Sequence, residues 1–223
     1  MSLPFFKNKN LQSGFTLVEM VTVVAIIVIM TIVVLANFPE FRDRSSLELV
    51  AQEVALVVRQ AQAFGTNTRA ASFSTLEFPS YGLYFNVNAP PGAVFQSNDS
   101  FRLFADDPSQ TGSIGRYSDG EVPCTPGTTE CREVYRLPTG ITFTKLETCQ
   151  SSGPCSNITA TNALNIVFAR PNPEAAFVSE SGSNLCGGSC SYAKITLSSV
   201  RAGTTQCVYI WATGHIYTKP SCP

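Results

Sequence analysis

Charged residues and histidine are scarce in this sequence, and both shortages limit what the protein can do. Charged residues make up 14% of the 223 residues, against roughly 25% in an ordinary soluble domain. The 15 basic residues are balanced by 16 acidic ones, so the chain lacks the positive surplus of a large nucleic-acid interface. A single histidine, His215, excludes a multi-histidine metal site and leaves one residue for any Ser-His-Asp or Cys-His centre.

Catalytic motifs are absent from the sequence as well. We find no nucleophile elbow, phosphate-binding loop or internal repeat. His215 stands in a candidate terminal hairpin, where a surface or packed role explains it better than catalysis. Four aspartates stand close together further upstream: Asp99, Asp106, Asp107 and Asp119. They lack EF-hand spacing, so we interpret them as a solvated acidic surface rather than a calcium site. The sequence predicts a protein that is not an enzyme and holds no metal or cofactor.

One long segment carries no charge at all. From Met20 to Phe38 the sequence reads MVTVVAIIVIMTIVVLANF, which as a helix would span roughly 29 Å, close to the hydrocarbon thickness of a bilayer. Valine and isoleucine would favour a strand in water, but no soluble sheet needs a strand of this length. The run therefore predicts a membrane-spanning helix.

The flanking charges predict its orientation. The leader contains Lys7 and Lys9 and no acidic residue, whereas the charges just after Phe38 nearly cancel. The positive-inside rule then places the N-terminus in the cytoplasm and the rest of the chain outside. The alternative is an ordinary cleaved secretory signal, but its apolar run would be shorter, and the sequence ANFPE at 36–40 is a poor cleavage site.

Glu19 interrupts this simple anchor. It ends the sequence GFTLVE at 14–19, one turn into the hydrophobic segment, where a carboxylate is costly unless it has a partner. It could simply mark the lipid–water boundary. If the chain were cut after Gly14, however, the new amine of Phe15 would lie about four residues away. That amine, from the same or a neighbouring subunit, would be a suitable partner.

The sequence GFTLVE, after a short basic leader and before a long apolar run, resembles the class III signal of type IV pilins and type II secretion pseudopilins. The resemblance covers about the first quarter of the chain. In that family a prepilin peptidase cuts after the glycine, here Gly14, and methylates the new N-terminal residue, here Phe15. The family's glutamate, matched by Glu19, is needed for subunits to assemble into a filament.

The residues after Pro39 continue the helical pattern. Apolar side chains recur at steps of three and four, at Leu47, Val50, Ala51, Val54, Val57, Val58, Ala61 and Phe64. Pro39 should kink or locally melt the helix, and Gly65 should end it. We expect one long helix over residues 16–64 whose second half packs on a globular head. A separate soluble helix is the alternative, but it would leave the apolar stripe unburied.

Short strands are expected in the remainder. The candidates are residues 82–87, 101–104, 133–137, 141–146, 164–169, 176–178, 193–197, 207–210 and 215–218. Turns are indicated at 89–92, 119–120, 138–140 and 213–214. The spacing suits an antiparallel sheet, and the region 106–126 looks most like an insertion. The segments LPTGI at 137–141, IVF at 166–168 and ATGHI at 212–216 resemble the head of the FimT/GspH group of minor pilins and pseudopilins.

All eight cysteines lie in the expected exported head: Cys124, Cys131, Cys149, Cys155, Cys186, Cys190, Cys207 and Cys222. An even number outside the cytoplasm indicates disulfides. Metal binding through the Cys186-x3-Cys190 pair and another pair is the rival interpretation. Eight cysteines allow 105 pairings. We favour pairing each cysteine with its next neighbour, because every such pair brackets a glycine, a proline or a turn.

These features together predict an α+β, pilin-like fold, in which a long N-terminal helix packs on an antiparallel β-sheet head stapled by disulfides. The helix has a membrane half and an amphipathic half. The expected divisions are a leader at 1–14, a transmembrane and assembly helix at 15–38, the amphipathic half of the helix at 39–65, and the head at 66–223.

The expected function is that of a structural subunit, a minor pilin or pseudopilin of a type IV pilus or type II secretion-like filament. Its expected partners are prepilin peptidase, other pilin or pseudopilin subunits and, before assembly, lipid of the inner membrane; the head would lie outside, and later in a periplasmic or extracellular filament. A DNA-binding minor pilin is the alternative. In that group an arginine-rich element follows the glycine, whereas here His215, Ile216 and Tyr217 follow Gly214. After Gly14 the chain has 13 basic and 16 acidic residues, so no nucleic-acid binding is expected.

Overall fold

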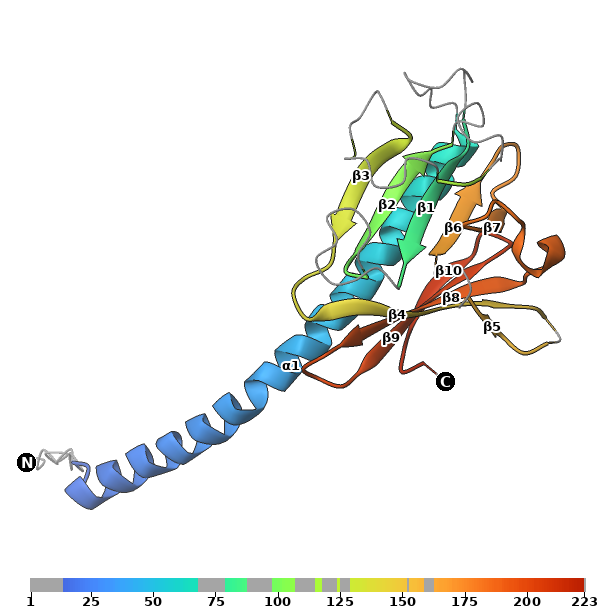
Figure 1. Cartoon of the computed structure of the whole chain (residues 1–223). Helices are drawn as coiled ribbons and strands as arrows, with labels where there is room; N and C mark the ends of the chain where they lie inside the picture. Colours follow the sequence, from blue (N-terminus) through green and yellow to red (C-terminus); the bar gives the residue numbers. More distant parts are fainter. Residues whose placement is uncertain are drawn as a thin grey trace, which may run out of the picture. The chain divides into compact units, whose positions relative to one another are not determined.

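The computed structural model describes residues 14–67, 79–87, 98–106, 115–117, 124, 129–151, 153–158 and 163–222 (Figure 1). The helix α1 (Leu17–Thr66) precedes a series of short strands. The chain divides into two compact units, Met1–Phe41 and Arg42–Pro223. The observed helix bounds lie within two residues of those expected from the sequence.

The first unit holds the apolar part of α1. Every side chain described in residues 17–41 is exposed, and α1 is long and apolar enough to span a membrane. Two threonines in it satisfy their hydroxyls within the helix: Thr22 donates to the carbonyl of Glu19 at 2.9 Å and Thr31 to that of Ile27 at 2.7 Å. Such internal bonds leave no hydroxyl in need of water, as a lipid environment requires.

Helical structure continues through Pro39. Of the two effects expected there, a kink or local melting, melting does not occur. The loss of one backbone donor is tolerated because the flanking residues still supply consecutive helical turns on both sides.

In the second unit, residues 42–66 of α1 bury one stripe. The apolar positions expected from the periodicity are buried, namely Leu47, Val50, Ala51, Val54, Val57, Val58 and Ala61, while Phe64 is half-buried. Glu48, Gln52, Glu53 and Arg59 on the other side are exposed. The stripe belongs to the same core cluster as the strands, so the alternative of an independent helix is wrong.

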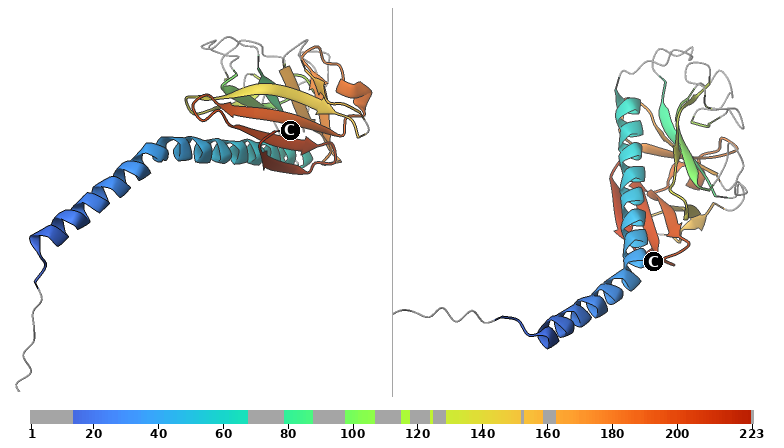
Figure 2. Two further views of the ribbon diagram at one scale, coloured as in Figure 1. Left: turned by 90° about the horizontal axis from the view of Figure 1, so that it is seen from below. Right: turned by 90° about the vertical axis from the view of Figure 1, so that its left-hand side faces the viewer.

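The described strands of this unit form two antiparallel sheets. The first has the order β3-β2-β1-β6-β7 and consists of β1 (Tyr81–Asn86), β2 (Ser100–Ala105), β3 (Cys131–Arg136), β6 (Ala163–Phe168) and β7 (Ala175–Ser179). The second has the order β10-β9-β8-β4-β5 and consists of β4 (Ile141–Cys149), β5 (Ser156–Asn157), β8 (Tyr192–Ser199), β9 (Thr205–Trp211) and β10 (Ile216–Pro220). A short 3-10 helix, η1 (Leu185–Gly188), follows β7. Figure 2 shows residues 42–66 of α1 running along these sheets.

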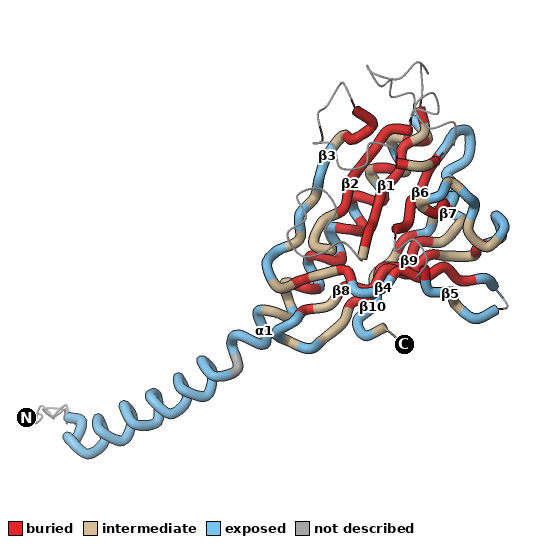
Figure 3. Tube along the Cα trace, in the orientation of Figure 1, coloured by how far each residue is buried: buried red, intermediate tan, exposed pale blue. Residues whose placement is uncertain are grey.

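The main core lies between this half of α1 and the strands. Phe85 and Phe101 stack with ring centroids 5.3 Å apart, and Phe143 meets both rings edge-on. From the second sheet, Ile195 and Ile210 complete the same cluster and are fully buried. Figure 3 shows that burial is concentrated along β1, β2 and β6 of the first sheet and along β4, β8 and β9 of the second.

All nine strands expected from the sequence are present, with bounds that differ by up to three residues. Two features differ from expectation: the strands form two sheets rather than one, and the two-residue strand β5 was not expected. The turns expected at 89–92 and 119–120 lie outside the described residues, as does most of the region 106–126.

The interpretation of the aspartates as a solvated surface is wrong for Asp106. Its side chain is 1% exposed, and its Oδ2 atom accepts hydrogen bonds from the Ser80 hydroxyl and the Gly115 backbone N–H, both at 2.9 Å. The carboxylate thus holds together the start of β1 and a distant loop. Asp107 and Asp119 lie outside the described residues.

Candidate functional site

Residues 14–16, directly before α1, include the Gly14–Phe15 bond at which the sequence predicts cleavage. Residues 14–16 are not helical. Among the described residues, chain neighbours aside, no atom lies within 4 Å of the position that a Cβ atom on Gly14 would take, and the Phe15 side chain is 77% exposed. A peptidase can bind a peptide bond in extended, uncovered backbone, whereas it would first have to unwind a helix. The structure therefore leaves the Gly14–Phe15 bond open to an enzyme.

Glu19 lies in the first turn of α1. Its backbone N–H donates to the hydroxyl of Thr16 at 3.2 Å, an N-cap contact that starts the helix at this point. The Glu19 side chain is exposed among exposed apolar neighbours, with Leu17 at 81% and Met20 at 55%. A carboxylate in the first turn interacts favourably with the positive end of the helix dipole. It also stands on a surface that lipid or another apolar helix can cover.

The head contains four disulfides. They join Cys124 to Cys131, Cys149 to Cys155, Cys186 to Cys190 and Cys207 to Cys222. Every bond links a cysteine to the next one in the sequence, the arrangement favoured above, and no cysteine is left free. The Cys186–Cys190 sulfurs are therefore not available as thiolate ligands. Within the described residues, no group of three or more histidine, cysteine, aspartate or glutamate side chains could hold a metal ion.

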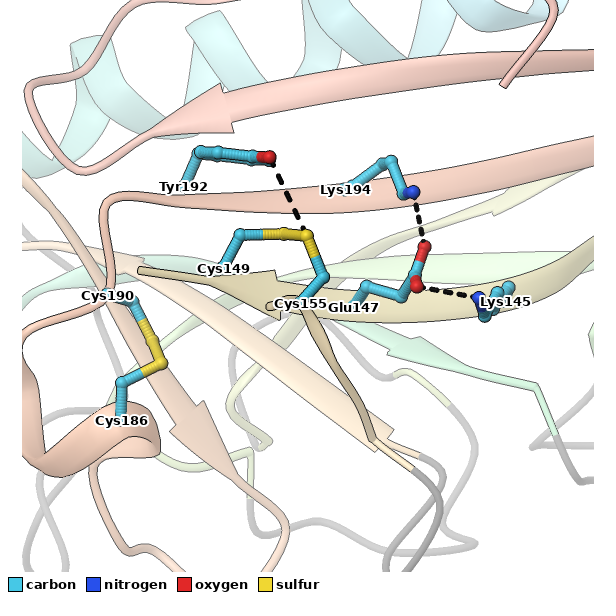
Figure 4. The surroundings of a disulfide bond; sticks show 8 residues. All are labelled: Lys145, Glu147, Cys149, Cys155, Cys186, Cys190, Tyr192 and Lys194. Atoms are coloured by element: carbon cyan, nitrogen blue, oxygen red, sulfur yellow. Dashed lines mark hydrogen bonds and ion pairs between the residues drawn. A yellow bond between two sulfur atoms is a disulfide. The ribbon is translucent and has the colours of Figure 1, made fainter. Parts of the chain in front are cut away.

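Glu147 and Lys194 form an ion pair on the second sheet (Figure 4). Strand register places Glu147 of β4 opposite Lys194 of β8. The Lys194 ammonium lies 2.6 Å from one carboxylate oxygen, and the ammonium of Lys145 lies 2.6 Å from the other. Burial raises the pKa of Glu147, but the hydrogen bonds and charges of the two lysines outweigh it and hold the pKa below its ordinary value. The carboxylate is consequently ionised and engaged at neutral pH.

Aromatic side chains continue this face of the sheet. Tyr209 of β9 stands opposite Lys194 and next to Tyr217 of β10, with the two tyrosine rings stacked 4.9 Å apart. The Tyr192 and Trp211 rings lie 5.0 Å apart in the neighbouring row. Aromatic pairs opposite each other stabilise a sheet. The two-residue spacing of Tyr209 and Trp211 along β9 is visible in the sequence, but strand pairing is needed to bring Tyr192 and Tyr217 beside them.

His215 is an exposed residue at the edge of this face. Its ring lies 5.6 Å from that of Tyr217. Of the two roles expected for it, surface or packed, the structure shows the surface one.

Comparison with known families gives one match. Residues 9–35 match the model of the prokaryotic N-terminal methylation motif. These residues carry a prepilin signal. The motif is that of type IV pilin-like proteins, which prepilin peptidase processes and which assemble with other pilin subunits. Together with the apolar helix it indicates a membrane-anchored protein.

The match covers residues 9–16 before α1 and residues 17–35 of its apolar part, and it confirms the family resemblance of this segment. Neither the search of curated proteins nor that of solved structures returns a match. The resemblance of the head to the FimT/GspH group has no support from these comparisons.

Proposed function

We propose that the protein is a minor pilin or pseudopilin, a structural subunit of a type IV pilus or type II secretion-like filament. The observation that carries the proposal is the methylation motif at residues 9–35, which runs from the segment before α1 into its exposed apolar part. A disulfide-bonded head suits a protein exposed outside the cytoplasm. In this role the protein is a building block, and the chemistry of its maturation is carried out by another enzyme.

Maturation would proceed in the open segment before α1. Prepilin peptidase cuts the bond after Gly14, removes the leader at 1–14 and methylates the amine of Phe15. The new cationic amine then lies about one helical turn from the carboxylate of Glu19. Within the apolar interior of a filament these two charges stabilise each other, because an unpaired charge there would be strongly unfavourable. The pairing of one subunit's amine with a neighbour's Glu19 would fix the axial position of each subunit relative to the next one in the filament.

The topology follows from the same proposal. Before assembly, residues 15–38 cross the inner membrane with the head outside, and residues 39–65 connect the span to the head at 66–223. After assembly the apolar helix exchanges lipid for the helices of neighbouring subunits.

We do not propose the DNA-binding alternative, because no observation favours it. The mature chain carries more acidic than basic residues. On the second sheet, Lys145 and Lys194 both contact Glu147, which lowers the positive potential that they offer to a phosphate.

Complementation of a strain that lacks this gene tests the proposal. Glu19→Leu should insert into the membrane as well as the unaltered protein, yet be absent or at least ten-fold depleted from sheared, purified filaments. Glu48→Leu is the matched control, since it removes an exposed carboxylate of α1 outside the apolar run; it should be incorporated normally. Normal incorporation of Glu19→Leu would contradict the proposed role of the carboxylate, and absence of the unaltered protein from filaments would contradict the function.

A further inference from the structure

A cavity of about 420 Å³ opens in the head between two loops that are far apart in the sequence. One wall comes from the end of β4, the residues after it and β5. The other wall comes from the end of β7, the turn that follows and η1. The lining residues are Thr148, Gln150, Pro154, Ser156, Asn157, Ile158, Ser179, Ser181, Ser183, Leu185 and Cys186. This volume falls within the range of roughly 300–1,000 Å³ that small-molecule sites occupy.

A disulfide holds each wall. Cys149–Cys155 closes the segment that carries Gln150 and Pro154, and Cys186–Cys190 closes η1 on the opposite side. Figure 4 shows the two bonds near each other. The walls are also joined directly, since the backbone N–H of Ser191 donates to the carbonyl of Cys149 at 2.7 Å. A ligand would therefore meet a preorganised site, which lowers the entropic cost of binding.

The polar groups of the cavity are hydroxyls and amides. None of its described lining residues carries a charge. Ser179, Ser181 and Ser183 form a triangle of hydroxyls 2.7 to 3.1 Å apart. Their protons are largely used within the triangle, but each hydroxyl oxygen has two acceptor sites, so the exposed Ser181 and Ser183 can still accept hydrogen bonds.

Across the cavity, the exposed side chains of Gln150 and Asn157 each offer two donors and one carbonyl acceptor. Apolar surface completes the lining, from the buried Ile158, from Leu185 and from Pro154.

This chemistry selects a ligand class. A phosphate, a carboxylate or a metal ion would need charged partners to offset its loss of water, and the described lining has none. A sugar ring offers the complement of what is present: several neutral hydroxyls, each a donor and an acceptor, and a C–H face that can rest on apolar surface.

From this complementarity we propose that the cavity binds a neutral saccharide. Gln150 and Asn157 bind its hydroxyls from one wall, Ser181 and Ser183 accept from the other, and Ile158 and Leu185 contact the ring. The proposal goes beyond the role of a filament subunit, because binding requires the folded head and not assembly.

The test uses the full-length protein in a zwitterionic detergent, since glycoside detergents would present competing sugars. Fluorescently labelled neutral trisaccharides of glucose, galactose and N-acetylglucosamine are titrated and followed by fluorescence anisotropy, with a uronic-acid trisaccharide as the anionic probe. The variant Gln150→Ala/Asn157→Ala removes two exposed amides and leaves the core intact. Asn172→Ala is the matched control, an exposed amide outside this cavity.

At least one neutral probe should bind, and the double variant should weaken that binding about five-fold or more, because each of the two lost hydrogen bonds is worth roughly 0.5–1.5 kcal/mol. Asn172→Ala should change the binding less than two-fold. Near-UV circular dichroism should be the same for all three proteins. The proposal is overturned if no neutral probe binds, if the uronic-acid probe binds more tightly than the neutral ones, or if the double variant binds as well as the control.

Discussion

The ammonium of Lys194 lies 2.6 Å from the carboxylate of Glu147, and both side chains are nearly buried, with exposed fractions of 9% and 6%. Lys145 contacts the same carboxylate at the same distance, but its side chain is 46% exposed. The Glu147 carboxylate therefore has one buried and one half-exposed partner. Substitutions of the two lysines form a matched pair that tests how burial affects the strength of the contact.

Replacement of Lys194 by methionine should lower the free energy of unfolding by about 3 kcal/mol, because Glu147 is left buried without its principal partner. Lys145→Met should cost less than about 1 kcal/mol, since water can replace a half-exposed ammonium. Urea titration of the full-length protein in detergent micelles, followed by near-UV circular dichroism, measures both. Equal losses would show that burial does not distinguish the two contacts.

Acid should remove the contribution of Glu147. Burial raises its pKa, but the hydrogen bonds and charges of Lys145 and Lys194 lower it further, to a value below the ordinary 4.5. A carboxyl whose pKa is lowered by folding contributes its stability above the unfolded pKa and loses it as the pH falls through the folded one. The stability difference between the unaltered protein and Glu147→Gln should therefore be constant above about pH 5 and shrink below pH 4.5. A difference that grows on acidification would contradict the assigned direction.

Gly65→Ala should destabilise the docking of α1 on the first sheet. A Cβ atom on Gly65 would overlap the carbonyl oxygen of Phe168, a backbone atom that cannot move aside. Overpacking of this kind costs about 1–3 kcal/mol. Gly153→Ala is the control, because its nearest neighbour would lie at an ordinary 3.5 Å. Thermal unfolding of both variants should show a lowered midpoint for Gly65→Ala alone.

The four disulfides should contribute unequally. In the chain-entropy account, removing Cys207–Cys222, whose residues are 15 apart, costs about 3 kcal/mol, and removing Cys186–Cys190, with a separation of 4, costs about 2 kcal/mol. Paired Cys→Ser variants, compared by urea titration, give both values. Peptide mapping without reduction should find only the four neighbour pairs; any long-range pair would contradict this arrangement.

Mass spectrometry of protein from native membranes should show a chain that begins at N-methylated Phe15. Gly14→Val should accumulate with its leader attached, because a branched side chain crowds the bond to be cut, while Gly14→Ala should be cut at a reduced rate. Efficient cleavage of the valine variant would argue against a site that requires glycine. An intact leader on the unaltered protein, in cells with active prepilin peptidase, would argue against processing altogether.

Local patterns in the sequence were enough to predict the helix and nine of the strands. The stripe from Leu47 to Phe64 has a helical period that burial on a head explains, and turn signals at four places separate several of the strands. The disulfide pairing could also be predicted, because each cysteine stands close to its partner in the sequence.

Long-range features could not be read in the same way. The division into two sheets depends on which strands pair, and the meeting of Glu147 with Lys194 depends on the register between β4 and β8. Asp106 looked like one of several surface aspartates until the fold placed Ser80 and Gly115 around it. The cavity is formed by loops about thirty residues apart in the sequence, so no local sequence pattern predicts it.

The order in which the cysteines are paired has a consequence for export. Suppose that the head enters an oxidising compartment with its N-terminal end first. The first, third, fifth and seventh cysteines in chain order can then each form a native bond as soon as the next cysteine has been exported. A simple thiol oxidase that joins successive cysteines then produces the native bonds directly. A disulfide isomerase, which corrects the wrong bonds of proteins with interleaved pairs, has nothing to correct here. Maturation of the head should accordingly depend on an oxidase and proceed at a normal rate without an isomerase.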